Sequence, residues 1–391
     1  DHRDLHSFPT RRSSDLTTPG LSYLVKEYQS DMGIMISASH NKPSDNGIKF
    51  FNRDGYKLST DEEEWIEHII FGNLIHHSNG NGNGKNGSSK GKVTQMKNAQ
   101  SDYVKFLAST VKGYSFKNMK IALDCAYGAA SPFAKSLFKK LGAQVCAIHD
   151  EPSGEHINKG GALDLKFLKE FVLANEADMG IALDGDGDRG IVVDEKGNVL
   201  DGDKILAVMA LGMVKQNKLN KNTVVGTVMS NLGLKVCLEN AGIKLLCTHV
   251  GDKYVLETLR KHELNLGGEQ SGHIIFFDHH ASPDGLLTAL QVLKVMKDSF
   301  SPLSQLAGCM TRMPQVLVNI KVKEKRPFEA LPAVMKKLEH FNARLKDQGR
   351  ILLRYSGTEN LARVMVEGKN HDEITQIANT LAEYIEKEIG I

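Results

Sequence analysis

The chain is most constrained by a regular alternation of short apolar runs and amphipathic segments that starts near residue 102. The apolar runs at 120–123, 144–148 and 179–183 have the length of buried strands. The segment after the first run places Phe133, Leu137, Phe138 and Leu141 on one helical face, and a further helix is expected over 163–174. Such alternation predicts a parallel, mostly buried sheet covered by helices.

A second region repeats this pattern, and the last region departs from it. Strands are expected at 223–228, 244–248 and 264–267, with helices at 232–241 and 253–261. After about residue 308 the order changes to a strand at 315–322, a helix at 328–338, strands at 350–354 and 362–366, and a closing amphipathic helix. We therefore expect a separate α+β domain, with a hinge near 308–313.

The first hundred residues are less regular. Residues 1–16 are polar, lack an initiator Met and lack the apolar core of a signal peptide, so we interpret them as a non-native leader. A helix at 20–29, a strand at 33–36 and a helix around Trp65 follow. Residues 78–92 are rich in Gly, Asn and Ser and predict a flexible insertion, and Val93 after Gly91-Lys92 excludes a phosphate-binding P-loop.

Together these patterns predict the α/β fold class, with three successive α/β domains of mixed or parallel sheets and a smaller α+β C-terminal domain around a central cleft. After the leader, the expected boundaries are 17–101, 102–200, 201–308 and 309–391.

Composition excludes several classes of function. The net charge is only +2, and no basic stripe with interleaved aromatic residues suggests nucleic-acid binding. No apolar run approaches the ~20 residues that a membrane span needs. The five cysteines have no CxxC spacing, which favours buried, reduced thiols and a cytoplasmic protein.

The strongest chemical signal is the run Asp184-Gly185-Asp186-Gly187-Asp188-Arg189. Carboxylates two residues apart, separated by pliable glycines, can converge on one hard cation such as Mg²⁺. Arg189 could neutralise a phosphoryl group or pair with its own aspartates. An EF-hand calcium loop is the alternative, because Glu195 falls at its twelfth position, but Arg189 occupies the sixth, where Gly is required.

A second signal is the serine loop that follows the strand at 33–36. Ser39 stands at the strand end, where its hydroxyl could be a nucleophile, with His40 or Lys49 supplying proton transfer or charge. The competing interpretation is an ordinary turn whose hydroxyls bond to the backbone.

Two further polar loops are weaker signals by themselves. The loop 267–273 offers Glu269, Ser271 and His273, a set suited to sugar hydroxyls. The loop between the last two strands offers a phosphate-binding set, namely Arg354, Ser356, Gly357, Thr358 and Arg363. Either loop could equally be an ordinary surface turn. On a hinged domain, the second would suggest a clamp that closes on substrate.

The four motifs SASHN…DNGIKFF, DGDGDR, GGEQSGH and RxSGTE…R occur in this order, and the chain from about residue 17 thereby resembles the α-D-phosphohexomutase superfamily, most of all its bacterial phosphoglucosamine mutase members. The resemblance implies that Ser39 carries a phosphoryl group and that Asp184, Asp186 and Asp188 bind Mg²⁺, which also touches that phosphate. It implies proton transfer by Lys49 and His273, with His40 and Arg189 at the phosphoserine. Glu269 and Ser271 would contact sugar hydroxyls, and the loop from Arg354 to Arg363 would hold the non-transferring phosphate.

The reaction implied by this resemblance interconverts glucosamine 6-phosphate and glucosamine 1-phosphate through a 1,6-bisphosphate, feeding UDP-N-acetylglucosamine and cell-wall precursor synthesis. The implied partners are a hexosamine phosphate and no macromolecule, in a monomer or homodimer. Lys42-Pro43, Pro283 and Asn360 depart from the usual pattern, and an upstream Thr-Gly-Ile-Arg-type motif is absent, so the first domain should expose a sheet edge. Phosphomannomutase/phosphoglucomutase activity, or an inactive fragment that still binds sugar phosphate, remain alternatives.

Overall fold

The computed structural model describes residues 16–71, 94–356 and 359–391. Contacts divide the chain into two compact units: Asp1–Met229 with Lys244–Ala307, and Ser230–Ile243 with Gly308–Ile391. The predicted leader, apart from Leu16, and the predicted insertion lie outside the described residues. No described helix has the length and apolar character that crossing a membrane requires.

A five-stranded sheet in the first unit has the order β4-β3-β5-β6-β7. Its strands are β3 (Lys120–Asp124), β4 (Gln144–Ile148), β5 (Met179–Leu183), β6 (Gly190–Asp194) and β7 (Val199–Leu200), with helices α4 (Ala134–Lys140) and α5 (Lys166–Ala174) and the 3₁₀ turn η1 (Gly161–Leu163) between them. The expectation of a parallel sheet holds only for β4, β3 and β5, because β6 and β7 pair antiparallel. The reason is that the aspartate loop joins β5 to β6 directly, without a crossover helix.

A four-stranded sheet in the same unit has the order β11-β10-β8-β9. Its elements are β8 (Thr223–Thr227), β9 (Lys244–Thr248), β10 (Leu266–Gly268), β11 (Ile274–Phe276), α6 (Gly202–Lys215), η2 (Asn220–Asn222), α8 (Asp252–His262), α9 (Gly285–Ser299) and α10 (Leu303–Ala307). The largely buried helix α9 packs against β5 and β6 of the first sheet and against β11 of the second. This packing brings the loop after β5 close to the loop after β10.

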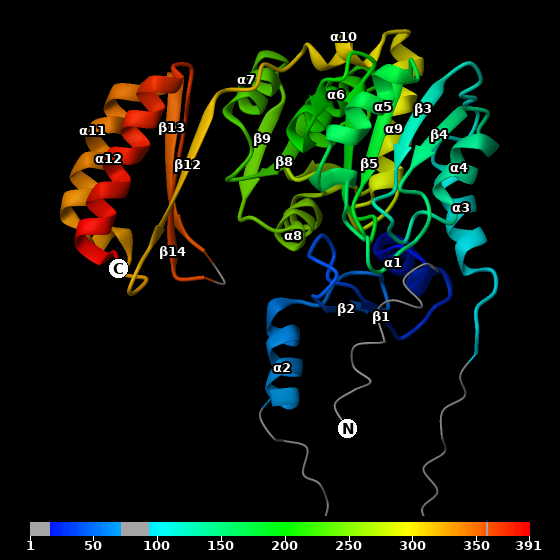
Figure 1. Cartoon of the computed structure of the whole chain (residues 1–391), viewed down its shortest axis with the longest axis horizontal. Coiled ribbons are helices and arrows are strands. Elements are labelled where there is room, and N and C mark those ends of the chain that lie inside the picture. Colours follow the sequence, from blue (N-terminus) through cyan, green and yellow to red (C-terminus); the bar gives the residue numbers. More distant parts are fainter. Residues whose placement is uncertain (1–15, 72–93, 357–358) are drawn as a thin grey trace, which may run out of the picture. The chain divides into compact units, whose positions relative to one another are not determined.

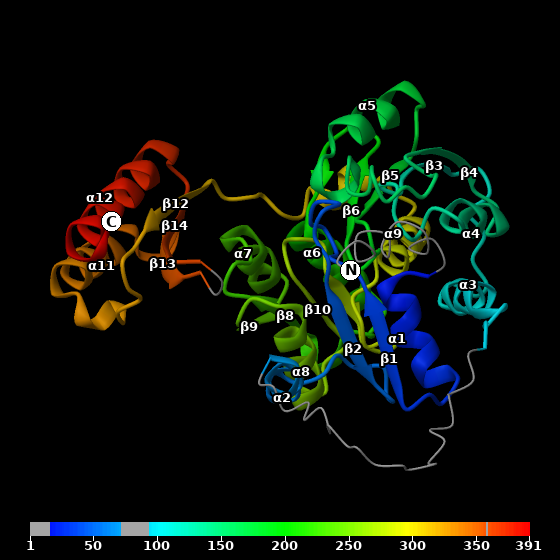
Figure 2. The ribbon, with the colours of Figure 1, turned by 60° about the horizontal axis from the view of Figure 1, so that its bottom comes forward.

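The N-terminal part of this unit contains a two-stranded antiparallel hairpin. Its elements are α1 (Thr18–Glu27), β1 (Met32–Ile36), β2 (Ile48–Asn52), α2 (Thr60–Phe71) and α3 (Ala99–Ser109). Figure 2 shows the hairpin beside α1. Met32, Ile34, Ile36 and Ile48 are each about half exposed, so within the described residues the hairpin leaves an apolar face uncovered.

The second unit contains an antiparallel sheet with two of its helices packed on one side. The order is β12-β14-β13, and α11 and α12 pack side by side against it (Figure 1). The elements are α7 (Leu232–Asn240), β12 (Gln315–Lys321), η3 (Phe328–Ala330), α11 (Pro332–Leu345), η4 (Lys346–Gln348), β13 (Gly349–Tyr355), β14 (Leu361–Gly368) and α12 (His371–Ile389). The helix expected from residue 328 begins instead at Pro332, because proline suits the first helical position.

No disulfide joins the five cysteines, all of which are described residues, as the sequence predicts. Cys125 and Cys237 are buried, whereas Cys247 is exposed, so the expectation of buried thiols fails for Cys247.

Candidate functional site

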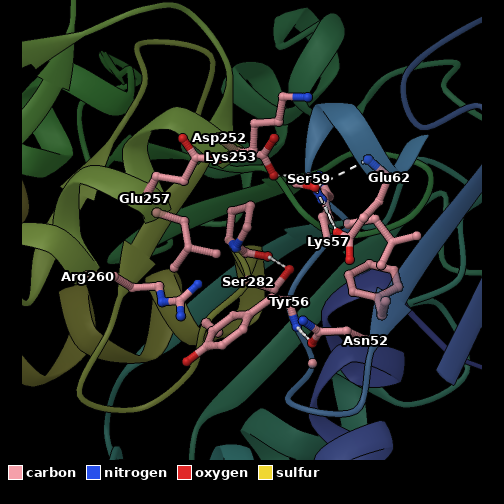
Figure 3. A pocket seen from close by; sticks show the side chains of 16 residues that line it. Asn52, Tyr56, Lys57, Ser59, Glu62, Asp252, Lys253, Glu257, Arg260 and Ser282 are labelled. Atoms are coloured by element: carbon pink, nitrogen blue, oxygen red, sulfur yellow. Dashed lines mark hydrogen bonds and ion pairs between the residues drawn. The ribbon is translucent and has the colours of Figure 1, made fainter. Parts of the chain in front are cut away.

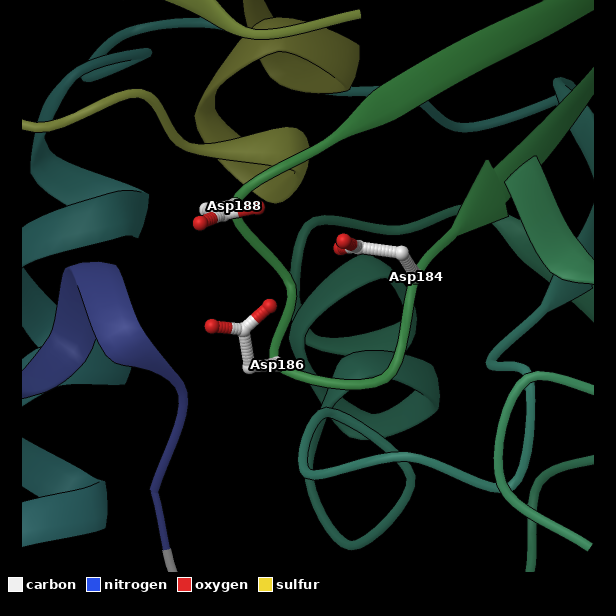
Figure 4. Close-up of side chains that lie close together, drawn as sticks. All are labelled: Asp184, Asp186 and Asp188. Carbon is white, nitrogen blue, oxygen red and sulfur yellow. The ribbon is translucent and has the colours of Figure 1, made fainter. Parts of the chain in front are cut away.

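The aspartate loop between β5 and β6 forms a compact acidic cluster. Asp184, Asp186 and Asp188 are at most 2% exposed. One ligand oxygen from each lies within 4.8 Å of those from the other two, and Figure 4 shows the three side chains converging from a single loop. Gly187 has a φ of 75°, a left-handed conformation that lets the backbone turn between the second and third carboxylates.

Burial and the surrounding charges shift the pKa values of Asp184 and Asp188 in opposite directions. Burial, together with the charges of Asp188 and Asp186, raises the pKa of Asp184 well above its usual range. Burial also opposes ionisation of Asp188, but the neighbouring charges of His273 and Lys49 outweigh it and hold the pKa of Asp188 well below its usual range. The cluster therefore needs positive charge beside it to remain ionised.

The cluster fits a hard divalent cation. Its donors are carboxylate oxygens, the ligands that Mg²⁺ prefers. Among the described residues, the buried Oδ1 of Asp186 has no hydrogen-bond partner. A buried oxygen without a partner is costly unless a cation binds it. The donor set and this oxygen together support a metal site.

The calcium-loop alternative is wrong for this cluster. The flanking elements are strands, not the two helices of an EF-hand. Glu195 does not face the cluster, because its carboxylate accepts hydrogen bonds from the backbone N–H and the hydroxyl of Ser304.

Lys49, on β2, is the nearest cation to the cluster. Its Nζ lies 2.6 Å from Asp186 Oδ2 and 3.0 Å from Asp188 Oδ2. Burial alone would lower the pKa of Lys49, but Asp188 and Asp186 raise it far above its usual value. Lys49 is therefore a charged group that already balances part of the acidic cluster.

Ser39 lies in the loop that follows β1, and its hydroxyl faces the aspartate cluster. Its Oγ is 3.3 Å from Asp184 Oδ2, and the Nδ1 of His40 is 3.3 Å from the same hydroxyl. The structure thus brings Ser39 to the aspartate cluster, although 145 residues separate it from Asp184 in the sequence.

His273 joins the sugar-loop candidate to the same cluster. Its Nε2 donates to Asp188 Oδ1 at 3.1 Å, and its Nδ1 donates to Glu269 Oε2 at 3.1 Å. Burial would lower the pKa of His273, but these two carboxylates raise it to about 10, so both ring nitrogens are protonated near neutrality. Ser271 is exposed, with its Oγ 3.4 Å from His273 Nδ1.

Glu269 is fixed from two sides. Besides its bond to His273, its Oε1 accepts a hydrogen bond of 2.8 Å from the backbone N–H of Gly251. Its side chain is 9% exposed. Glu269 therefore orients His273 in this structure, and its remaining lone pairs are what it could offer to a ligand.

Arg189 and His40 complete the cluster. Arg189 Nη2 donates to His40 Nδ1 at 2.9 Å, and its backbone N–H donates to Asp184 Oδ1 at 3.1 Å. Burial and then the Arg189 charge lower the pKa of His40. His40 is therefore a neutral imidazole at neutral pH, next to the Ser39 hydroxyl.

A small cavity separates the serine-loop hairpin from α8 (Figure 3). Its volume is about 130 Å³. Lys57, just after β2, pairs with Asp252 at the start of α8, with Nζ 2.5 Å from Oδ2. Arg260 lies over the ring of Tyr56, 4.3 Å from its centroid. These contacts hold the hairpin that carries Lys49 against α8.

The phosphate-loop candidate lies in the second unit. Arg354 and Arg363 are register partners on β13 and β14, and Arg363 Nη2 donates to Ser356 Oγ at 3.4 Å. Burial and then the charge of Arg363 lower the pKa of Arg354. Among the described residues, Arg363 Nε has no hydrogen-bond partner. Gly357 and Thr358 lie outside the described residues.

Sequence reasoning missed three residues at these sites. Thr18 donates to Asp186 Oδ2 at 2.5 Å, Asn158 bonds to both the serine loop and the aspartate loop, and Lys325 donates to the carbonyl of Ser356 at 2.7 Å. None belongs to a recognisable motif, so only the fold could reveal them.

Comparison with known proteins gives four family matches in order along the chain. They are the Phosphoglucomutase/phosphomannomutase alpha/beta/alpha domains I (residues 9–74), II (101–197) and III (201–313) and the C-terminal domain (317–384).

Two curated relatives are identical to this chain at nearly half of the aligned residues. The phosphoglucosamine mutase of Thermoanaerobacter sp. (strain X514) is 47% identical over 378 residues, which cover 96% of this chain and 83% of the relative. That of Geotalea uraniireducens (strain Rf4) is 48% identical over 377 residues, covering 96% and 82%.

Solved structures share the fold at lower identity. A Phosphoglucomutase/phosphomannomutase family protein from Burkholderia thailandensis has a TM-score of 0.76 at 20% identity and covers 96% of this chain and 83% of its own. The Aspergillus fumigatus N-acetylphosphoglucosamine mutase, in complex with GlcNAc-6P and magnesium, has a TM-score of 0.65 at 17% identity and covers 95% and 92%.

Proposed function

Because this chain belongs to the α-D-phosphohexomutase superfamily, we propose that it is a phosphoglucosamine mutase that interconverts glucosamine 6-phosphate and glucosamine 1-phosphate. The observation that carries this proposal is the meeting of Ser39 Oγ with Asp184 in a cluster that also holds Lys49 and His273. A hydroxyl, a carboxylate cluster for a cation and fixed positive charges are the components of phosphoryl transfer.

In this proposal, the phosphoryl group on Ser39 passes to the free hydroxyl of the sugar monophosphate and gives the 1,6-bisphosphate. After the bisphosphate reorients, its other phosphoryl group returns to Ser39. Asp184, Asp186 and Asp188 would hold Mg²⁺, which when bound would supply positive charge for the transferring phosphoryl group.

The chain's own residues supply charge and protons. His273, kept protonated by its two carboxylate partners, and Lys49 are suited to give a proton to the oxygen that leaves phosphorus and then to take the proton of the attacking hydroxyl. Neutral His40 lies beside the Ser39 hydroxyl, with Nδ1 3.3 Å from Oγ, and the same nitrogen accepts a hydrogen bond from Arg189. Arg189 supplies a fixed charge beside Ser39.

Two loops would hold the substrate. Glu269 and Ser271 would contact sugar hydroxyls. Arg354, Ser356 and Arg363, with Gly357 and Thr358, would hold the phosphate that is not transferred. Lys325, whose Nζ reaches the Ser356 carbonyl, adds a third cation to this set.

A coupled assay for glucosamine 1-phosphate formation, with and without Mg²⁺, tests the proposal. We expect Mg²⁺-dependent turnover that Ser39→Ala abolishes; turnover that survives in Ser39→Ala would contradict the proposal. Glucose and mannose 6-phosphates assayed alongside decide the sugar, and a preference for either would make the chain a phosphoglucomutase/phosphomannomutase. An inactive chain that still binds sugar phosphate would support the fragment alternative.

A further inference from the structure

Asn158 connects the serine loop to the aspartate loop through its side chain alone. Its Nδ2 donates to the carbonyl of Ser39 at 2.9 Å and to the carbonyl of Asn41 at 3.0 Å. Its Oδ1 accepts a hydrogen bond of 2.8 Å from the backbone N–H of Gly185. Both amide hydrogens and the amide oxygen are therefore used to join two loops that are far apart in sequence.

The serine loop needs such support because its backbone is strained at the reactive residue. Ser39 has a φ of 55°, in the left-handed region, which costs a residue with a Cβ about 1 kcal/mol. The Asn158 amide binds the carbonyl of this residue and the carbonyl two residues later. Strain of this kind persists only where surrounding contacts hold it.

The aspartate loop is packed closely at the same point. A Cβ on Gly185 would lie 2.9 Å from the Ser39 carbonyl oxygen and 2.9 Å from Ile157 Cδ1. The two loops and the segment that carries Asn158 are thus in direct contact. A shift of the Asn158 side chain would change the separation of Ser39 Oγ and Asp184 Oδ2, now 3.3 Å.

We infer that Asn158 is a positioning residue for phosphoryl transfer. It holds the Ser39 hydroxyl at its present distance from the carboxylates of Asp184, Asp186 and Asp188. This role rests on the proposed mutase function and adds to it a residue that does not touch the reacting atoms. It explains why the position is an asparagine: Asn158 itself has a φ of 67°, which Asn tolerates better than most residues, and its amide alone offers two donors and an acceptor at this reach.

Asn158→Asp isolates the donor function. Aspartate has the same shape, tolerates the left-handed backbone and can still accept from Gly185, but it replaces the two N–H donors with an oxygen facing two carbonyls. Asn158→Gly removes both the donors and the acceptor. Asn118 provides the matched control, because it is also an asparagine with a left-handed φ, 69°, and is exposed.

Turnover of glucosamine 6-phosphate gives the first readout. Since a misplacement of about 1 Å can cost about 100-fold in rate, we expect Asn158→Asp to lower kcat by about 100-fold and to change KM by less than threefold. Asn118→Asp should match the unchanged chain in both constants. The unfolding midpoint of each variant, followed by circular dichroism, separates this effect from a loss of folding.

Amide hydrogen exchange gives a second readout that does not need activity. We expect the peptide covering 37–41 to exchange faster in both Asn158 variants, and the Gly185 amide to lose protection in Asn158→Gly but keep it in Asn158→Asp. A kcat of Asn158→Asp within twofold of the unchanged chain, or unaltered exchange in 37–41, overturns the inference. If the unchanged chain turns over no hexose phosphate, the proposed function fails, and exchange alone still decides whether Asn158 holds the loop.

Discussion

The buried His280 should make the fold less stable at pH 5 than at pH 7.5, because the unfolded chain takes up a proton there that the folded chain excludes. His280 is 7% exposed, and its Nε2 donates a hydrogen bond of 3.0 Å to the carbonyl of Pro19 in α1. Burial lowers its pKa to about 4, and the charge of Lys26 adds to the effect. The contact joins the segment after β11 to α1, which packs against the serine-loop hairpin.

The magnitude follows from linkage between protonation and folding. The pKa of His280 rises from about 4 in the folded chain to about 6.5 when the chain unfolds, so the unfolded state binds the proton first as the pH falls. Its stabilising contribution is complete above pH 6.5 and is lost as the pH falls towards 4. The loss is about 2 kcal/mol at pH 5 and about 3 kcal/mol below pH 4.

Urea unfolding followed by circular dichroism at pH 7.5 and pH 5 measures this effect. His280→Gln retains an N–H that can reach Pro19 but does not titrate, so we expect the free-energy difference between the unchanged chain and this variant to shift by about 2 kcal/mol between the two pH values. His68→Gln, which removes an exposed imidazole from α2, is the matched control. Parallel pH profiles for the unchanged chain and His280→Gln would refute the reasoning.

Two further predictions concern a buried ion pair and the metal site. Glu367 is fully buried and pairs with Arg350 at 2.5 Å, so Arg350→Met should lower the free energy of unfolding by about 3 kcal/mol. Arg344→Met, which breaks the more exposed pair with Glu373, should cost 1 kcal/mol or less, and equal losses in the two variants would contradict this account. Saturating Mg²⁺ at about 100 times its Kd should stabilise the chain by about 2.7 kcal/mol. EDTA should reverse the accompanying rise in melting temperature, and Asp186→Asn should weaken it; a full response in Asp186→Asn would count against the site.

Much of the fold could be predicted from local pattern. The strands β4, β5 and β9 have the expected bounds, because short apolar runs between polar turns leave little freedom in where a strand begins and ends. Whether neighbouring strands pair parallel or antiparallel was harder to predict from the sequence. The antiparallel return of β6 depends on the absence of a helix after the aspartate loop, and the later start of α11 depends on Pro332.

Part of the chemistry of the site could also be predicted from local sequence patterns. Three aspartates at alternate positions identify a cation site from spacing alone, and the four ordered motifs identify the family. Contacts between segments that are far apart in the sequence could not be predicted. The bond from Asn158 to Ser39 spans 119 residues, and the bond from Thr18 to Asp186 spans 168, and neither leaves a local signal in the sequence.

Phosphoryl exchange at Ser39 tests the central claim most directly. The chain is incubated with glucosamine 1,6-bisphosphate and Mg²⁺, and the site of phosphorylation is read by peptide mass spectrometry. We predict a phosphoryl group on Ser39 that disappears when glucosamine 6-phosphate is added, and no labelling when Asp184, Asp186 and Asp188 are all replaced by Asn. Phosphorylation at another residue, or undiminished labelling of Ser39 without the three carboxylates, would contradict the claim that this hydroxyl and the aspartate cluster act as one centre.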